Sequence, residues 1–163
     1  MGLKSLLAKP FADYIAKRVY DAAKNAVANQ EKIMMELVQT AAQTQFGKDH
    51  HFSNVRNYED FKAAVPVRDY EALRYYIDKM VDGESDVLWP GKPLYLAKTS
   101  GTTSGVKYIP LTKASIPNHI NSARNALLMY VHETRNTDFI SGKMIFLQGS
   151  PVLGEKNGIK TGR

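Results

Sequence analysis

Two short apolar runs, Pro93-Leu-Tyr-Leu-Ala97 and Tyr108-Ile-Pro-Leu111, enclose the stretch Thr99-Ser-Gly-Thr-Thr-Ser-Gly-Val-Lys107. This pattern predicts two strands, at 94–98 and 108–111, joined by a hairpin-like turn. Glycine permits positive φ and a close approach of the backbone to a ligand, and consecutive exposed N–H groups in such a turn can bind an anion. Hydroxyl side chains add donors for phosphate oxygens, and Lys107 adds a mobile positive charge. The stretch therefore has the donors that a triphosphate needs.

An ordinary surface turn rich in serine, threonine and glycine would have the same composition. The spacing Gly101-x-x-x-Gly105-x-Lys107 also departs from the Walker A motif. The order Thr-Ser-Gly-Thr-Thr followed by Lys resembles the phosphate-binding loop of the adenylate-forming superfamily, which includes acyl-CoA synthetases, peptide-synthetase adenylation domains and luciferases. Ser104 stands where most of that superfamily has glycine, and Val106 where it has proline.

This variant of the loop is similar to that of one branch, the Gretchen-Hagen (auxin-responsive) family of acyl acid amido synthetases. Five further segments resemble the N-terminal region of that family: Phe61-Lys-Ala-Ala-Val-Pro-Val67, Tyr70, Gly83-Glu84, Leu88-Trp-Pro-Gly91 and Tyr108-Ile-Pro-Leu-Thr112. The resemblance covers nearly all of the chain, and the loop is its most specific part.

The resemblance implies an ATP-dependent ligase with Mg²⁺. A small carboxylic acid attacks the α-phosphorus of ATP to give an acyl-adenylate and pyrophosphate, and an amine or amino acid then displaces AMP to form an amide. The resemblance makes Lys107 the catalytic residue, which offsets charge on the departing pyrophosphate. It assigns ATP binding to Thr99, Ser100, Gly101, Thr102, Thr103, Ser104 and Gly105. The ligands of the metal are expected outside these residues.

Arg124 is the candidate for binding the acid substrate. Its neighbours at three- and four-residue spacing, Ile120, Leu127 and Leu128, are apolar. The resemblance implies that the guanidinium binds the substrate carboxylate, with which it can pair bidentately. An arginine that packs its stem on apolar neighbours and exposes its head to solvent fits the same pattern. Both interpretations stay open here.

Members of the family run to several hundred residues, whereas this sequence has 163. The resemblance therefore implies about the first third of such an enzyme, inactive by itself and able to self-associate through an uncovered apolar face. The length alone fits one domain. Two other interpretations remain open: a stand-alone nucleotide-binding module, and a helical interaction protein without catalysis.

Composition narrows the classes of function. The sequence has no cysteine, which excludes disulfides, thiolate nucleophiles and cysteine-based zinc sites. The net charge is +6, but the basic residues are scattered, so we expect no nucleic-acid partner. No apolar stretch has the length of a membrane span, and we expect a cytoplasmic protein without a membrane partner. The adjacent His50 and His51 are not spaced as a metal site, so we expect none there.

Hydrophobic periodicity predicts an α/β fold, with a helix-rich region at 1–92 and a strand–loop–strand–helix–strand region at 93–163 that begins an adenylating domain. The apolar stripe over 3–27 predicts core-facing helix, broken near Pro10. A second stripe over 33–46 predicts a helix capped by Gly47. The polar, glycine-spaced residues 154–163 are expected to form an exposed segment.

Further helices follow from capping signals. Asn57 is the expected cap of a helix over 58–64, and Arg68-Asp69 begin a helix that Gly83 ends. Thr112 or Ser115 begins another, which runs to about Arg135 with Pro117 in its first turn. The apolar residues 143–147 predict a buried strand.

Overall fold

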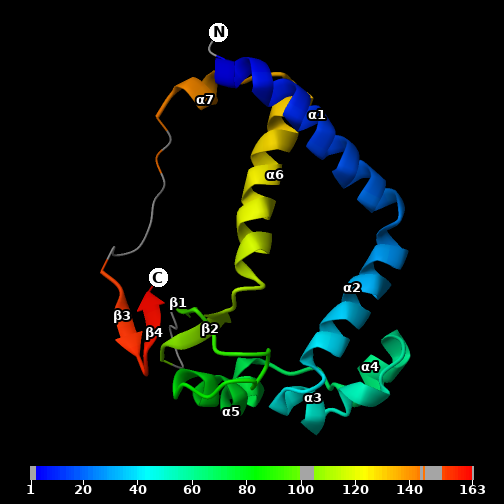
Figure 1. Ribbon diagram of the computed structural model, residues 1–163, viewed down its shortest axis with the longest axis vertical. Helices are drawn as coiled ribbons and strands as arrows, with labels where there is room; N and C mark the ends of the chain where they lie inside the picture. Colours follow the sequence, from blue (N-terminus) through cyan, green and yellow to red (C-terminus); the bar gives the residue numbers. More distant parts are fainter. Residues whose placement is uncertain (1–2, 100–104, 144, 146–151, 163) are drawn as a thin grey trace. The chain divides into compact units, whose positions relative to one another are not determined.

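The computed structural model describes residues 3–99, 105–143, 145 and 152–162 (Figure 1). Within these residues the fold is mixed α/β and rich in helix, as the sequence predicts. The helices are α1 (Leu3–Lys24), α2 (Ala26–Ala41), α3 (Gln45–Asp49), the 3₁₀ helix η1 (Phe52–Asn54), α4 (Tyr58–Ala64), α5 (Tyr70–Val81), α6 (Ile116–Thr134) and α7 (Asp138–Ser141). The strands are β1 (Tyr95–Thr99), β2 (Lys107–Leu111), β3 (Gly154–Lys156) and β4 (Ile159–Gly162).

The chain forms two compact units, which are described separately. One consists of Met1–Asn29 with Ala114–Leu147, and the other of Gln30–Lys113 with Gln148–Arg163. These units are defined by packing. The division into 1–92 and 93–163 that the sequence suggests is by functional role, and it stays a prediction. None of the helices in the described part of the chain combines the length and the apolar character that a bilayer crossing needs.

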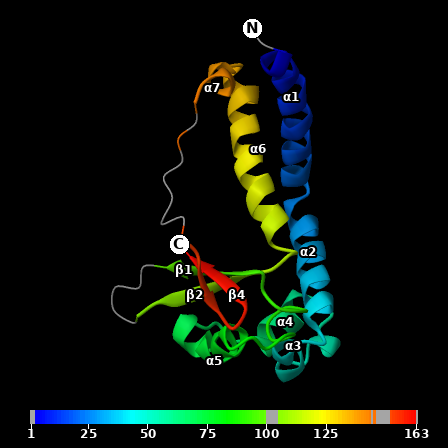
Figure 2. The ribbon, with the colours of Figure 1, turned by 60° about the vertical axis from the view of Figure 1, so that its left-hand side comes forward.

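The first unit is helical. Figure 2 shows α1 and α6 side by side, and α7 also contacts α1. Ala12, Ile15 and Ala16 on α1 and Val131 on α6 are buried. Small side chains at two of these positions allow the helices to approach closely. A buried hydrogen bond of 2.5 Å between the hydroxyls of Ser5 and Thr137 joins α1 to the residue just before α7.

Two predictions for α1 are wrong. The helix continues through Pro10 and ends at Lys24, next to Asn25, whose side chain donates to the carbonyl of Asp21. The buried face stabilises the helix despite the hydrogen bond that proline removes. Leu7, Phe11 and Tyr14, which the sequence placed in the core, are exposed because they lie on a different face from Ala12, Ile15 and Ala16.

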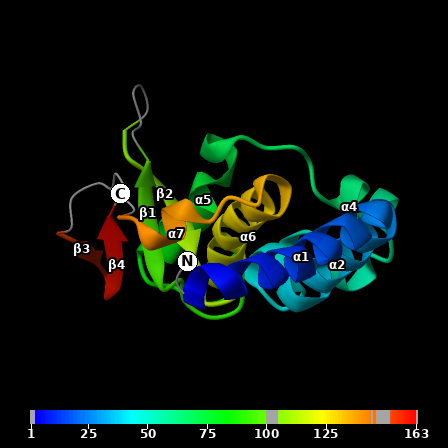
Figure 3. The same cartoon turned by 90° about the horizontal axis from the view of Figure 1, so that it is seen from above.

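The second unit contains a four-stranded sheet with the order β2-β1-β4-β3 (Figure 3). The strands β1 and β2 pair antiparallel, as predicted, with Thr99 opposite Lys107 and Tyr95 opposite Leu111. The strand β4 runs parallel to β1 on its other side. Helix α5 packs on the sheet through a buried cluster: Ile77, Val81, Leu96 and Ile159.

The strands β3 and β4 were not expected. They form an antiparallel hairpin in which Lys156 pairs with Ile159 across Asn157 and Gly158, both with positive φ (48° and 81°). Two adjacent residues with positive φ are the signature of a type I′ turn, for which Asn-Gly is a preferred sequence. Ile159 and Thr161 are buried, so the terminal segment is part of the unit and not a loose polar tail.

The predicted cap of α4 and the predicted start of α5 were confirmed. Asn57 accepts a hydrogen bond from the amide of Asp60 at the start of α4, and Asp69 accepts one from the amide of Ala72 at the start of α5. Gly83 follows α5 with a φ of 92°. Helix α6 begins after Ser115 and ends at Thr134.

Two other predictions do not hold. Gly47 is not a cap of α2, because α2 ends at Ala41 and Gly47 lies inside α3. A Cβ atom there would overlap the carbonyl oxygen of Ala41, so the close approach of two backbones explains the glycine. Of the expected strand at 143–147, Lys143 and Ile145 are described, neither is in a strand, and Ile145 is 87% exposed. Its other three residues lie outside the described residues.

Candidate functional site

The candidate site is the hairpin of β1 and β2. Thr99 and Lys107 are the last pair of the ladder, so both lie at the base of the turn. Gly105 has a φ of 80°, and no atom of the described residues lies within 4 Å of its Cβ position, so its backbone conformation favours glycine. The expected phosphate contacts at Ser100, Gly101, Thr102, Thr103 and Ser104 lie outside the described residues.

Lys107 is held near the first turn of α5. Its Nζ atom lies 5.1 Å from the centre of the Tyr70 ring and 3.8 Å from Oε1 of Glu71. The first distance is within the range of a cation–π contact. The second is an ion pair but is too long for a hydrogen bond. The Lys107 side chain is 32% exposed, so the ammonium is partly desolvated yet open to an incoming anion.

Tyr70 connects this helix to the edge of the sheet. Its phenolic oxygen accepts a hydrogen bond of 2.8 Å from the backbone N–H of Tyr108. The strand β2 is at the edge of the sheet, so this N–H would otherwise have no ladder partner on that side. Asp69 caps α5 directly before Tyr70 and thereby fixes Tyr70 as the first residue of the helix. Tyr70 therefore contacts the Lys107 ammonium through its ring and accepts a hydrogen bond from the strand that carries Lys107.

Arg74 completes the surroundings of Glu71. Its Nη2 and Nε atoms lie 2.6 Å and 2.7 Å from Oε2 of that carboxylate. The hydrogen bond that Arg74 donates to Glu71, followed by the negative charge of Glu71, raises the pKa of the Arg74 guanidinium. The same guanidinium lies 5.7 Å from the centre of the Tyr70 ring. Two cations thus share one carboxylate and one aromatic ring.

The sequence did not identify Glu71 as part of this site. Tyr70 was noted as part of the family pattern, but no local signal connects residues 70 and 71 with residues 107 and 108. The connection arises from the packing of α5 on the sheet, which spacing along the chain cannot report. Lys156 was likewise missed, and its Nζ lies 5.0 Å from the centre of the Tyr108 ring.

Arg124 belongs to the other compact unit. It is exposed on α6, and its Nη2 donates to Oδ1 of its neighbour Asn125 at 3.2 Å. Ile120 and Leu127, one turn away on either side, are exposed as well. The guanidinium is therefore accessible to a carboxylate, and this geometry fits both interpretations of the residue.

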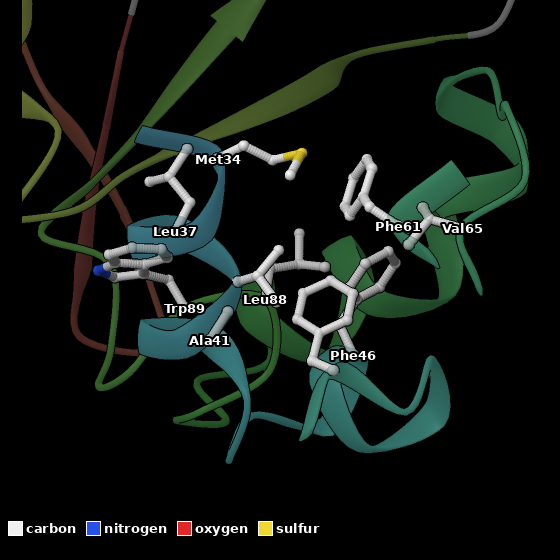
Figure 4. A pocket seen from close by; sticks show the side chains of 10 residues that line it. Met34, Leu37, Ala41, Phe46, Phe61, Val65, Leu88 and Trp89 are labelled. Carbon is white, nitrogen blue, oxygen red and sulfur yellow. The ribbon is translucent and has the colours of Figure 1, made fainter. Parts of the chain in front are cut away.

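A separate pocket in the second unit has a volume of about 340 Å³ (Figure 4). Helix α2 supplies its aliphatic side, and Phe46, Phe52, Phe61 and Trp89 supply four aromatic rings. Apart from the indole N–H of Trp89, its lining side chains have no nitrogen or oxygen atom. Apart from that indole N–H, the lining side chains offer no hydrogen-bond partner for a phosphate or a carboxylate, so this pocket is not the candidate site.

The adjacent residues His50 and His51 have different surroundings in the fold. His50 is buried, stacks on Phe46 with ring centres 4.0 Å apart, and places Nδ1 2.8 Å from the carbonyl oxygen of Phe46. His51 is exposed and has a φ of 52°. One ring therefore points into the aromatic cluster and the other into solvent.

Comparison with known proteins identifies relatives of this chain. An indole-3-acetic acid-amido synthetase, GH3.15, from Arabidopsis thaliana is 34% identical over 115 residues, covering 69% of this chain and 19% of that protein. A jasmonoyl–L-amino acid synthetase, JAR4, from Nicotiana attenuata is 23% identical over 142 residues, covering 85% of this chain and 24% of that protein. The chain thus spans about a fifth to a quarter of the length of these relatives.

Solved structures of acyl acid amido synthetases are similar to this chain as well. The structure of the acyl acid amido synthetase AtGH3.15 in complex with 2,4-DB superposes with a TM-score of 0.80 at 25% identity, over 92% of this chain and 26% of that one. The model of the GH3 family N-terminal domain matches residues 15–163. The resemblance drawn from the turn and its flanking segments is confirmed, and the chain belongs to the GH3 family.

Proposed function

We propose that these residues contribute the phosphate-binding hairpin of an ATP-dependent acyl acid amido synthetase. The activity is proposed for a polypeptide that carries them together with the segments of the relatives that lie outside the match. Its substrates would be ATP, a small carboxylic acid, and an amine or amino acid. These residues alone would not catalyse the reaction, because they cover only 19–24% of the two relatives compared above.

The observation that supports the proposal most is the pairing of Thr99 with Lys107 at the base of the turn. It puts a hydroxyl and an ammonium at the two ends of the Ser/Thr/Gly-rich stretch. Gly105, with its positive φ, exposes backbone rather than a side chain beside them. This set of donors fits the oxygens of a polyphosphate. Ser100, Thr102 and Thr103 would add hydroxyl contacts from the turn itself.

Lys107 would then act on the leaving group. When a carboxylate oxygen of the acid attacks the α-phosphorus, a new oxygen–phosphorus bond forms. The bond between the α-phosphorus and the bridging oxygen breaks, and its electron pair leaves with pyrophosphate. A cation beside the departing oxygens stabilises that developing charge. Mg²⁺ would share this task when bound, through ligands outside these residues. The amine then displaces AMP and forms the amide.

Arg124 would bind the carboxylate of the acid before it reacts. Its head is exposed, and it donates a hydrogen bond of 3.2 Å to the neutral amide oxygen of Asn125. A substrate carboxylate would be a stronger, charge-assisted partner. The exposed apolar side chains of Ile120 and Leu127 beside it suit the non-polar body of an aryl or indole acid.

The proposal is tested by acid-dependent exchange of labelled pyrophosphate into ATP, with a panel of aryl, indole and aliphatic acids. Lys107→Ala should reduce exchange strongly, by about 100-fold, the scale of one lost transition-state contact. Lys113→Ala, which removes an exposed lysine two residues beyond β2, is the matched control and should leave exchange unchanged. Absence of exchange with every acid, in a folded complete enzyme that carries these residues, would refute the proposal.

A further inference from the structure

Glu71 faces two cations with its two oxygens. Oε2 lies 2.6 Å from Nη2 of Arg74, whereas Oε1 lies 3.8 Å from Nζ of Lys107. Arg74 is three residues further along α5, so the helix itself brings this pair together. The contact with Arg74 is close and the contact with Lys107 is loose. The carboxylate is therefore fixed by its own helix and not by the lysine.

The position of Glu71 in α5 strengthens this arrangement. It lies in the first turn of α5, which Asp69 caps. The partial positive charge at a helix N-terminus favours a carboxylate there. Glu71 is consequently held in place by Arg74 whether or not Lys107 remains beside it.

Among the described residues Lys107 has two partners, and neither contact is a hydrogen bond. The Tyr70 ring attracts the ammonium through its face, and Glu71 attracts it through charge. An anion bound at the base of the turn would need the same ammonium. It would also lie well within one Debye length, about 10 Å at 0.1 M salt, of the Glu71 carboxylate. Glu71 would therefore repel the ligand that Lys107 attracts.

We propose that Glu71 is a positioning residue that competes with polyphosphate for Lys107 and thereby weakens the retention of pyrophosphate at the hairpin. The inference rests on the proposed function, because it identifies pyrophosphate as the product whose release Glu71 promotes. Tyr70 and Glu71 hold the ammonium at the hairpin, and the repulsion from Glu71 prevents a highly charged product from remaining bound.

The experiment titrates inorganic pyrophosphate into this chain without a divalent metal, observed by NMR at the amides of Gly105, Lys107 and Tyr108. Glu71→Gln keeps the size of the side chain and an oxygen acceptor for Arg74, but removes the charge. It should lower the Kd for pyrophosphate by about three- to tenfold at low ionic strength, and the gain should shrink as salt is added.

Two control variants separate this effect from general changes in charge or fold. Glu59→Gln removes the same charge from α4, where Glu59 pairs with Lys62 at 3.2 Å and at the same three-residue spacing. It should change the Kd less than about twofold, because an exposed charge away from the hairpin is screened. In a Lys107→Gln background, Glu71→Gln should give no further gain, because the competition has been removed.

The outcomes are distinct. An unchanged or higher Kd for Glu71→Gln overturns the inference, since Glu71 would then support the site and not oppose it. No shift at Gly105, Lys107 or Tyr108 in either protein overturns it too, because no anion site would exist. A gain that persists in the Lys107→Gln background assigns the effect to general charge and not to competition. Pyrophosphate binding with the expected gain, but without acid-dependent exchange in the assay above, would refute the proposed function and leave the role of Glu71 intact.

Discussion

The backbone N–H of Tyr108 donates to the phenolic oxygen of Tyr70 over 2.8 Å and thereby ties an edge strand to a helix. Pro110, two residues further along β2, has no N–H to offer on either side. Tyr108 therefore provides a point at which the edge of β2 is hydrogen-bonded outside the sheet. The ring of Tyr70 also lies under the ammonium of Lys107.

Tyr70→Phe should therefore destabilise the protein by about 1 kcal/mol, the net value of one hydrogen bond with a part-buried donor left without its partner. The ring and its contact with Lys107 would remain. Urea unfolding followed through Trp89, the one tryptophan of the sequence, measures the stability. Hydrogen exchange at the amide of Tyr108 should accelerate at the same time. Unaltered exchange at that amide would contradict the assigned role of the hydroxyl.

Asp13 should make the helical unit sensitive to acid. His132 Nδ1 and Arg135 Nη1 each lie 2.6 Å from its Oδ1 atom. The hydrogen bond from His132, and then the bond and charge of Arg135, lower the pKa of Asp13 below its usual value of 3.8. A carboxyl whose pKa is lower in the folded state stabilises that state above its unfolded pKa, and this contribution is lost as the pH falls through the folded pKa.

Asp13→Asn should accordingly lower the urea midpoint at pH 7 and flatten its dependence on pH between about pH 5 and pH 2. Circular dichroism at 222 nm, recorded over a series of pH values, is a suitable measurement because the affected unit is helical. If the variant loses stability in acid as steeply as the natural chain does, other carboxyls cause that loss.

Two glycines should respond to alanine for different reasons. Gly47→Ala places a Cβ against the carbonyl oxygen of Ala41, in a buried position, and should destabilise the protein by about 3 kcal/mol through overpacking. Gly91→Ala meets no atom within 4 Å but keeps a φ of 79°, and should cost about 1 kcal/mol of conformational strain. Urea unfolding of both variants provides the comparison. Equal losses would show that the close approach at Gly47 is relieved by a backbone shift.

Arg124 provides a test of acid recognition. If it binds the substrate carboxylate, Arg124→Ala in the complete enzyme should weaken acid binding by about 1.5–3 kcal/mol, the value of a hydrogen bond to a charged group. The affinity for ATP should not change. Isothermal titration with the acid and with ATP separates the two effects, and Arg18→Ala, an exposed arginine on α1, serves as the control. An unchanged affinity for the acid would favour the solvent-exposed interpretation.

Local chemistry made part of the fold predictable. The cap at Asn57, the start of a helix at Arg68-Asp69 and the antiparallel pairing of β1 with β2 depend on residues a few positions apart, and all three predictions were confirmed. The Asn157-Gly158 turn carried an equally local signal. It was missed because the flanking residues lack the alternating apolar pattern of a strand.

The features that the sequence did not predict depend on contacts between residues far apart in the chain. The rule that proline ends a helix did not hold at Pro10, because a buried face beginning two residues later packs against α6. Gly47 was assigned to a cap because the sequence cannot show that the backbone of Ala41 passes beside it. Glu71 escaped notice for the same reason, since only the docking of α5 on the sheet brings it to Lys107.

The position of β4 in the sheet has a consequence for the time course of folding. Across one side of β1, Tyr95 pairs with Leu111, close in the chain, whereas across the other side it pairs with Lys160, beyond α6 and α7. Closing a long loop costs more entropy than closing a hairpin, and contacts between distant residues slow folding. We expect β1 and β2 to associate early and the addition of β4 to limit the rate. Until β4 arrives, β1 has a free edge to which a strand of a second chain can add.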